Sequence, residues 1–263
     1  MVNMVITMNK QERQQQILNL IHEVGEVQTQ TICRKFHIVA MTARRDLGEL
    51  EEQGEIIRTH GGAIAKEKKT FDAQTPLLLR LKTKYEQKEQ IAEFAKQFLQ
   101  PHDCVFIASG STIEIFSKKL IHYIPLTIVS DAVNVAYHLY QDPHLHIFMV
   151  GGELRSNSFT LTGSIAESNL KQFRLTKAFI SVNGIDEEGN LYTSSVVESG
   201  LLEVLFKNVE HVYVLCDGSK LGKKDFIAIS HTQPYTLITD YTADKNLLEV
   251  YTKKGIINQQ ANA

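Results

Sequence analysis

The sequence contains a short run of hydroxyl and glycine residues that could bind an anion. Ser109, Gly110, Ser111 and Thr112 follow the apolar run 104–108 and open a segment with helical periodicity. The first N–H groups of a helix have no acceptor within the helix, so they can hold a phosphate together with nearby hydroxyls. Many such loops are only turns, and the run by itself leaves that alternative open.

Further polar residues follow other predicted strands. The remaining candidate ligand-binding residues are Ser130, Gly152, Arg155, Asn183, Asp186, Glu198, Asp217 and Lys220. Taken singly, Arg155 or Lys220 could equally be a surface cation or part of an internal ion pair. The carboxyl ends of parallel strands meet at one edge of a sheet, where ligands bind. The convergence therefore indicates a small polyhydroxylated anion, with phosphate on the 109–112 loop and Lys220 and hydroxyls on carboxylate and amide groups.

A second kind of chemistry is indicated by a predicted helix over residues 41–53. Ala43, Leu47 and Leu50 recur at i, i+4 and i+7, which predicts an apolar stripe facing a core. The stripe turns Thr42, Arg45, Asp46 and Glu49 outward and leaves Arg44 at the flank. Basic residues near the first turns of a helix suit insertion into the major groove of DNA.

An isolated basic pair can also be a solvated helix face, and this interpretation stays open on the residues alone. The predicted DNA contacts include basic residues of the preceding helix and the following turn: Arg34, Lys35, Thr42, Arg44, Arg45, Arg58 and His60.

The elements that position these residues follow from spacing. An amphipathic helix begins near Asn9 and is ended by Gly25, and a short helix opens at Gln28 or Thr29. After the third helix, residues 55–59 and 62–65 are predicted to pair as two short strands around a tight turn. This order predicts a helix-turn-helix followed by a β wing.

The rest of the chain alternates apolar runs with helical segments, which favours a Rossmann-like α/β domain with a parallel sheet. The predicted strands are 104–108, 126–130, 145–150, 177–182, 211–216 and 235–239. The predicted helices are 85–99, 112–121, 133–140, 165–173, 197–208 and 243–251. The predicted domains are 8–65 and 76–263, joined by a charged linker over 66–75.

Charge and composition limit the function classes. The 263 residues carry 28 Lys and Arg against 30 Asp and Glu, so the formal net charge is 28 − 30 = −2, which excludes a protein that is basic throughout. Residues 28–46 alone carry four basic and one acidic side chain, a net of +3. We therefore expect weak non-specific DNA affinity and tight binding only through correctly spaced paired sites.

The sequence offers no membrane-spanning run, secretory signal or paired cysteine motif. We expect a cytoplasmic protein with three buried thiols, no metal site and no cofactor.

The motifs at the start of the chain resemble the winged helix-turn-helix of the DeoR family of bacterial transcriptional regulators. The resemblance rests on residues 42–47, 50–54 and 58–63, and on a Met-x-x-x-Glu-Arg start at Met8, which leaves Met1 and Met8 as alternative starts. Val39 stands where the family usually has serine, and Ala43 where it has isoleucine or valine. The missing hydroxyl removes a phosphate contact or cap worth about 1 kcal/mol.

The second segment resembles the effector domain of the same family, which is similar in turn to ribose-5-phosphate isomerase. The phosphate loop resembles 109–112, the Asp-x-Ser-Lys motif resembles 217–220, and Glu198 falls near the isomerase base. Asn183 stands where the enzyme has aspartate, and an amide cannot shuttle a proton at neutral pH. Leu201 and Leu202 replace a basic residue that is usual in the family.

The resemblance implies a repressor of a sugar-metabolism operon that is not an enzyme. Its partners would be double-stranded operator DNA, a second copy or three further copies of the chain, and a sugar phosphate. Similarity of 41–47 and 220–226 to the lactose phosphotransferase branch of the family favours a ketohexose phosphate such as tagatose-6-phosphate. The alternatives are a sugar-phosphate isomerase with an accessory domain and an α/β module whose winged helix binds protein.

Overall fold

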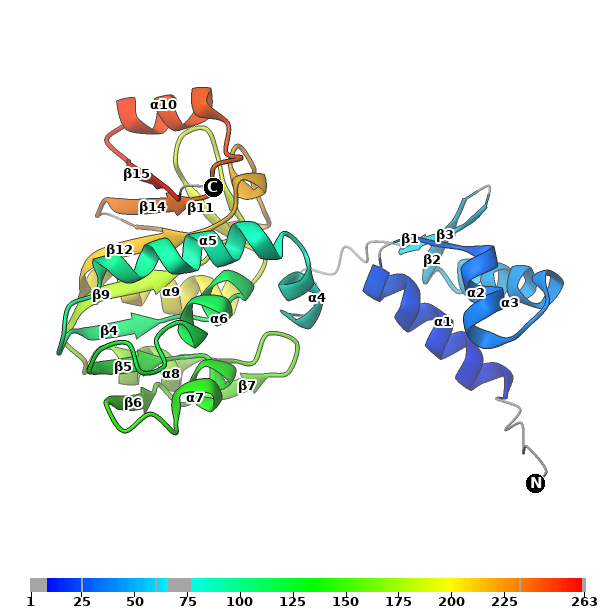
Figure 1. The fold of residues 1–263 in the computed structure, drawn as a ribbon, viewed down its shortest axis with the longest axis horizontal. Coiled ribbons are helices and arrows are strands. Elements are labelled where there is room, and N and C mark those ends of the chain that lie inside the picture. The colour runs from blue at the N-terminus through cyan, green and yellow to red at the C-terminus, as the bar shows by residue number, and fades with distance from the viewer. Residues whose placement is uncertain (1–8, 25, 60, 66–76, 232, 262–263) are drawn as a thin grey trace. The chain divides into compact units, whose positions relative to one another are not determined.

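The computed structural model describes residues 9–24, 26–59, 61–65, 77–231 and 233–261 (Figure 1). The chain divides into two compact units, residues 1–70 and 71–263. The predicted linker 66–75 and the predicted DNA contact His60 lie outside the described residues.

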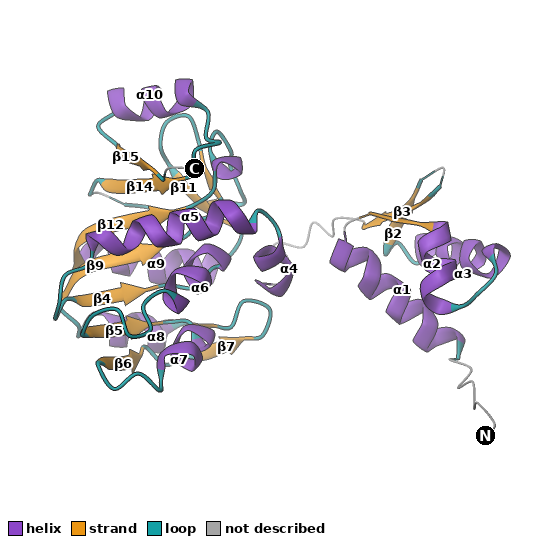
Figure 2. Cartoon of the chain, viewed as in Figure 1, coloured by secondary structure: helices purple, strands orange, loops and turns teal. Residues whose placement is uncertain are grey.

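The first unit packs three helices against a small antiparallel sheet (Figure 2). Its elements are α1 (Lys10–Val24), β1 (Glu26–Gln28), α2 (Thr29–Phe36), α3 (Ala40–Glu52), β2 (Ile56–Arg58) and β3 (Gly62–Ala65). The predicted hairpin is present as β2 and β3, which pair antiparallel. The sequence did not predict β1, which adds a third strand beside β3 and joins the end of α1 to α2.

The core of the first unit contains the predicted stripe of α3. Ala43, Leu47 and Leu50 are buried together with Ile17 and Ile21 of α1. Val24, the last residue of α1, is exposed.

The prediction that Asp46 faces outward is wrong. Its side chain is fully buried, and Arg13 of α1 donates to it from Nε at 2.7 Å and from a terminal nitrogen at 3.1 Å. Asp46 lies three residues after Ala43 and four before Leu50, so it shares their helix face. The apolar stripe alone could not show that a guanidinium on α1 would satisfy a carboxylate there.

The second unit is an α/β domain built on a seven-stranded parallel sheet in the order β15-β14-β12-β9-β4-β5-β6, counted over the described residues. The six predicted strands are all in this sheet, with ends shifted by two residues or fewer. The sheet strands are β4 (Cys104–Ile107), β5 (Leu126–Ser130), β6 (Leu145–Met149), β9 (Leu175–Ile180), β12 (Val209–Leu215), β14 (Tyr235–Thr239) and β15 (Ile257–Gln260).

Helices cover both faces of the sheet. The helices are α4 (Leu77–Lys82), α5 (Tyr85–Ala95), α6 (Ser111–Lys118), α7 (Val133–Leu139), α8 (Ser164–Leu170), α9 (Val196–Asn208) and α10 (Lys245–Lys253), with single 3-10 turns η1 (Lys96–Phe98) and η2 (Gly218–Lys220). One apolar cluster joins the sheet to α5, α6 and α7, and another joins it to α8, α9 and α10. Figure 1 shows α5, α6 and α7 in front of the sheet.

Alternation along the strands explains the two clusters. In β4, Val105 and Ile107 belong to one cluster and Phe106 to the other, because successive side chains point to opposite faces. The predicted fold class, a parallel-sheet α/β domain with a small helix-turn-helix domain, is confirmed.

The sequence missed the shortest elements of the second unit. These are α4, the edge strand β15, and the strands β7 (Glu153–Arg155), β8 (Thr160–Thr162), β10 (Gly184–Ile185), β11 (Leu191–Thr193) and β13 (Ile227–Ala228). Strands of two or three residues are too short to show a period. Of the three thiols predicted to be buried, Cys216 is buried, whereas Cys33 and Cys104 are partly exposed.

None of the described helices combines the length and the apolar character that crossing a bilayer requires.

Candidate functional site

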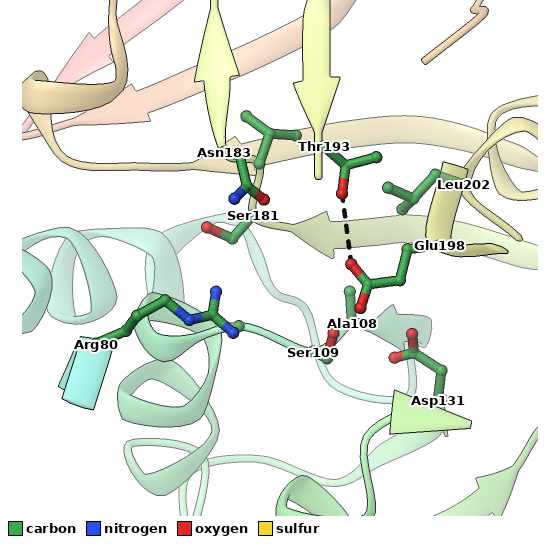
Figure 3. Close-up of a pocket in the computed structure, with 11 residues that line it drawn as sticks. Arg80, Ala108, Ser109, Asp131, Ser181, Asn183, Thr193, Glu198 and Leu202 are labelled. Carbon is green, nitrogen blue, oxygen red and sulfur yellow. Dashed lines mark hydrogen bonds between the residues drawn. The ribbon is translucent and has the colours of Figure 1, made fainter. Parts of the chain in front are cut away.

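A small polar pocket, partly open to solvent, lies at the carboxyl edge of the parallel sheet (Figure 3). Four of the predicted ligand-binding residues line it: Ser109, Gly110, Asn183 and Glu198. The other lining residues are Arg80, Ala108, Asp131, Ser181, Val182, Thr193 and Leu202. The strands β4, β5 and β9 end at this edge, which is why residues far apart in the sequence meet here.

The predicted anion loop opens α6. Gly110 is the N-cap residue, with φ at +134°, a conformation that residues with a Cβ rarely adopt. A Cβ at Gly110 would lie 3.0 Å from the Cβ of Ser181 across the pocket. Ser111 and Thr112 follow in the first turn and are buried. The first N–H groups of α6 are therefore next to the pocket and without acceptors within the helix.

Three charged side chains line the pocket, of which Asp131 is buried and Arg80 and Glu198 are partly buried. Arg80, on α4, lies on one side of the cavity, and the carboxyl groups of Asp131 and Glu198 lie on the other (Figure 3). Burial lowers the pKa of Arg80, and the charge of Glu198 opposes that shift. The Nε of Arg80 is buried and has no hydrogen-bond partner among the described residues.

The sequence did not predict Arg80 or Asp131 as site residues. Asp131 follows β5, it is 4% exposed, and its Oδ1 has no hydrogen-bond partner among the described residues. Burial raises its pKa well above the usual range, and the negative charge of Glu198 adds to the effect. Glu198 itself accepts a hydrogen bond from the hydroxyl of Thr193 at 3.4 Å.

A cluster of charged residues next to Arg80 includes Lys88 and the predicted residues Asp217 and Lys220. Lys88, on α5, is 3% exposed and donates from Nζ to the carbonyl oxygens of Arg80 and Thr83, the latter at 2.7 Å. Burial lowers the pKa of Lys88 to about 8; the charge of Asp217 opposes this shift, and Lys220 and Arg80 add to it. Asp217 and Lys220 are not among the pocket-lining residues, but both act on Lys88 electrostatically.

Signals for the three missed residues were present in the sequence. Arg80 is the single charge in the run Leu-Leu-Leu-Arg-Leu at 77–81, and Asp131 directly follows the predicted strand 126–130. Lys88 lies on the predicted helix 85–99 among polar residues and gave no such signal. Arg80, Asp131 and Lys88 are distinguished by the burial of charged groups, which the spacing of residues in the sequence does not predict.

Ser130, at the end of β5, connects this strand to the end of β4. Its hydroxyl donates to the carbonyl oxygen of Ile107 at 2.7 Å and accepts from the N–H of Ala132 at 3.0 Å. Ser130 is fully buried and outside the pocket lining. It positions Asp131 next to the end of β4.

Asp186 also lies outside the pocket lining. Its carboxylate accepts from the side chains of Asn190 and Tyr192 and pairs with Lys224 at 3.6 Å. Burial raises the pKa of Asp186, but the hydrogen bonds from Asn190 and Tyr192 outweigh it and leave the pKa lowered. In the structure it closes the turn between β10 and β11, so it does not join the other candidate residues.

Gly152 and Arg155 lie on a hairpin and not in the pocket lining. Gly152 has φ at +108°, and a Cβ there would lie 2.4 Å from the carbonyl oxygen of Thr162. It is thus required by close backbone packing. Arg155 donates a hydrogen bond to the hydroxyl of Ser195, the N-cap residue of α9.

The candidate DNA-binding surface is the first half of α3 with the end of α2. Arg44 and Arg45 are exposed, and Arg45 lies 3.8 Å from the carboxylate of Glu49. The N-cap residue Val39 makes no side-chain cap, so the first N–H groups of α3 stay open. Arg34 and Lys35 are exposed on the last turn of α2.

Two acidic side chains of α3, Asp46 and Glu49, are paired with residues of α1. Glu49 lies 2.6 Å from Nζ of Lys10 and accepts from Gln14 at 2.7 Å, and these contacts lower its pKa. Asp46 is paired with Arg13. The exposed start of α3 therefore keeps a positive field that the net charge of the unit conceals.

The remaining predicted DNA contacts differ in environment. Thr42 is half-buried on the same turn as Arg45. Arg58, on β2, lies 3.9 Å from the carboxylate of Glu51, and its backbone N–H donates to the same side chain at 3.1 Å. Arg58 is thus drawn toward the end of α3.

The described residues contain no group of three or more His, Cys, Asp or Glu side chains that could hold a metal ion.

Two family models match this chain. A DeoR-like helix-turn-helix domain matches residues 13–69, and a DeoR C-terminal sensor domain matches residues 83–241. The chain belongs to the DeoR family.

Curated relatives agree with this assignment. The chain is 32% identical to the lactose phosphotransferase system repressor of Staphylococcus epidermidis over 222 residues, which cover 83% of this chain and 87% of the relative. It is 30% identical to the glycerol-3-phosphate regulon repressor of Escherichia coli K12 over 250 residues, which cover 95% of this chain and 98% of the relative.

Among solved structures, ribose-5-phosphate isomerase A of Methanocaldococcus jannaschii aligns with 53% of this chain and 55% of its own, with a TM-score of 0.40 and 14% identity. A similarity of this size carries no argument about function.

Proposed function

We propose that this DeoR-family protein represses a sugar-metabolism operon and that a phosphorylated sugar in the sensor pocket changes its affinity for DNA. Residues 8–65 would bind the operator, 66–75 would join the domains, and 76–263 would bind the effector. The relatives are named as repressors of a lactose phosphotransferase system and a glycerol-3-phosphate regulon, which supports a repressor role.

The observation that carries the ligand class is the polarity of the pocket. One side offers Arg80, with Lys88 and Lys220 close by, and the start of α6. The other side offers two carboxyl groups. A ligand with a phosphate at one end and hydroxyl groups at the other satisfies both sides. Tagatose-6-phosphate is such a ligand, and the kinship with lactose phosphotransferase repressors favours it.

The DNA-binding part of the proposal rests on the exposed Arg44 and Arg45 with the open N-terminus of α3. Arginine side chains there can contact guanine edges or phosphates in the major groove. Two copies in a dimer or tetramer would present paired recognition helices to paired half-sites.

The position of α4 suggests how the pocket could act on DNA binding. This helix directly follows the joining segment in the chain and carries Arg80 into the pocket. Its amino end is held by the N–H of Leu77 donating to the carbonyl oxygen of Asn157 at 3.1 Å, and its carboxyl end by Lys88. A ligand that engages Arg80 would favour one placement of α4, and so shift the population that binds DNA.

A thermal-shift experiment on the full chain tests the ligand class. Tagatose-6-phosphate, other hexose phosphates and inorganic phosphate are compared with unphosphorylated tagatose, because a ligand of the folded state raises its apparent stability. We expect a shift of several degrees with a sugar phosphate and none with tagatose. No shift with any phosphorylated sugar would contradict the proposal.

The response to the effector is tested by binding to a labelled fragment of the promoter of the protein's own gene. Arg80→Gln, Ser111→Ala and Lys220→Ala should bind this DNA as the wild type does but lose the effect of sugar phosphate. Lys82→Gln, on the exposed side of α4, is the matched control and should keep it. Failure of the wild type to exceed its affinity for unrelated DNA at about 150 mM salt would reject the repressor role.

The alternative function is a sugar-phosphate isomerase. Asn183 lines the pocket where a proton-transferring carboxylate would be needed, and its amide cannot take that role. Multiple turnovers of a hexose phosphate or ribose-5-phosphate that Glu198→Gln abolishes would favour the enzyme.

A further inference from the structure

We propose that the buried carboxyl group of Asp131 is protonated in the free protein and donates a hydrogen bond to a neutral oxygen of the ligand. The pocket would thereby reject ligands that carry a second negative charge at this end. The inference rests on the proposed function, because it concerns the selectivity of the same site.

The first support is the placement of the two groups. Asp131 follows β5, Glu198 lies in the first turn of α9, and both line the pocket. Figure 3 shows the two carboxyl groups facing the same part of the cavity, on the side away from Arg80. A ligand with its phosphate near Arg80 would direct its other end toward them.

The second support is the hydrogen bonding of Asp131. Its carboxyl group accepts from its own backbone N–H and from that of Ser109. Its Oδ1 is buried with no partner among the described residues. A buried polar atom without a partner costs about 1–3 kcal/mol, and a ligand oxygen facing a protonated Oδ1 would remove that cost.

The third support is the set of charges facing this pair. Glu198 faces Asp131 from α9, and its negative charge disfavours ionisation of Asp131. Arg80, on α4, is a cation of the lining; burial lowers its pKa, and the negative charge of Glu198 opposes this shift. The other polar groups of the lining, Ser181, Asn183 and Thr193 among them, are neutral. A buried carboxyl group beside a negative charge favours its protonated form.

The consequence is a specific chemical preference. A hydroxyl or carbonyl oxygen can accept from the protonated carboxyl of Asp131, whereas a ligand carboxylate would meet the negative charge of Glu198. The pocket should therefore accept a phosphorylated aldose or ketose and reject a phosphorylated sugar acid.

The test compares the wild type with Asp131→Asn and Asp131→Ala on the full chain. The amide of asparagine keeps the shape and a donor at every pH, so it imitates the protonated carboxyl. Glu210→Gln is the control, since it removes an exposed carboxylate near the start of β12, at the opposite edge of the sheet. Calorimetry measures the affinity for tagatose-6-phosphate and for 6-phosphogluconate between pH 5.5 and 8.5.

We expect the wild type and Glu210→Gln to lose at least about tenfold more affinity for the sugar phosphate over this range than Asp131→Asn does. The difference between variants isolates Asp131, because Lys88 and the phosphate titrate alike in both. Asp131→Ala should bind weakly at every pH, and the wild type should bind 6-phosphogluconate at least about tenfold more weakly than the sugar phosphate. Equal pH slopes in the wild type and Asp131→Asn, or equal affinity for the two ligands, would overturn the proposal.

A second measurement needs no ligand. A carboxyl group whose native pKa is raised loses stability as pH rises from its unfolded value of about 4 toward the native one. Urea unfolding should therefore show wild-type stability falling relative to Asp131→Asn over that window. A constant difference would overturn the protonated state of Asp131 even if no sugar phosphate binds, an outcome that would separately reject the proposed function.

Discussion

The buried Asp46 of the first unit and two charged residues at the pocket of the second unit, Arg80 and Asp131, differ in how fully they are hydrogen-bonded. In the first unit the buried carboxylate of Asp46 has two hydrogen bonds from Arg13. In the second unit Arg80 and Asp131 each keep a buried polar atom without a hydrogen-bond partner among the described residues. Complete pairing stabilises a fold, whereas incomplete pairing in a pocket leaves interactions for a ligand to complete. The comparison separates a structural ion pair from a binding site.

The largest effect should come from breaking the complete pair. Asp46→Ala leaves Arg13 without its partner, and we expect the first unit to lose about 3–5 kcal/mol of unfolding free energy. Urea unfolding followed by circular dichroism would show an earlier transition of this unit, with the transition of the second unit unchanged. Glu52→Gln, which alters an exposed carboxylate on the same helix, serves as the control. A loss below about 1 kcal/mol would mean that the pair is as weak as a surface ion pair.

A smaller effect should follow from removing an exposed charge of the first unit. Arg45→Ala should cost about 1–3 kcal/mol of DNA-binding free energy, enough to abolish specific recognition if the site depends on paired contacts. Fluorescence anisotropy on the promoter fragment measures the loss, and the thermal shift with sugar phosphate should stay at the wild-type value. Unchanged affinity would show that Arg44-Arg45 is only a solvated helix face.

The smallest effect concerns the buried cation Lys88 of the second unit and appears only when the pH is varied. The pKa of Lys88 is lowered to about 8 mainly by burial, so Lys88 loses its charge just above neutral pH. A phosphate prefers the protonated form, so effector affinity should fall as pH rises from 7 to 9, by at most about tenfold per pH unit. Lys88→Arg keeps the charge and should reduce this fall to the part that Asp131 causes. Calorimetry across the same range measures it, and equal slopes in both proteins would exclude Lys88 from the response.

The comparison also explains which predictions held. Periodicity located α1, α3 and the six predicted sheet strands within a few residues, because burial of one face repeats at the period of the element. The sequence could place Ser109, Gly110 and Asn183 at the pocket, since the carboxyl ends of parallel strands meet at one edge; their role in binding stays a prediction. Asp186 also follows a strand but lies outside the pocket lining, because its carboxylate accepts hydrogen bonds within the turn between β10 and β11.

By itself the sequence determined the family, the order of elements and the two kinds of chemistry, since motifs and local periods are properties of neighbouring residues. Only the tertiary structure decided which charges lie buried. Arg13 meets Asp46 across 33 residues, and Arg80 meets Glu198 across a far longer stretch of chain. Whether a charge is paired, shifted in pKa or left for a ligand depends on solvent exclusion and on groups from distant elements, which no local spacing encodes.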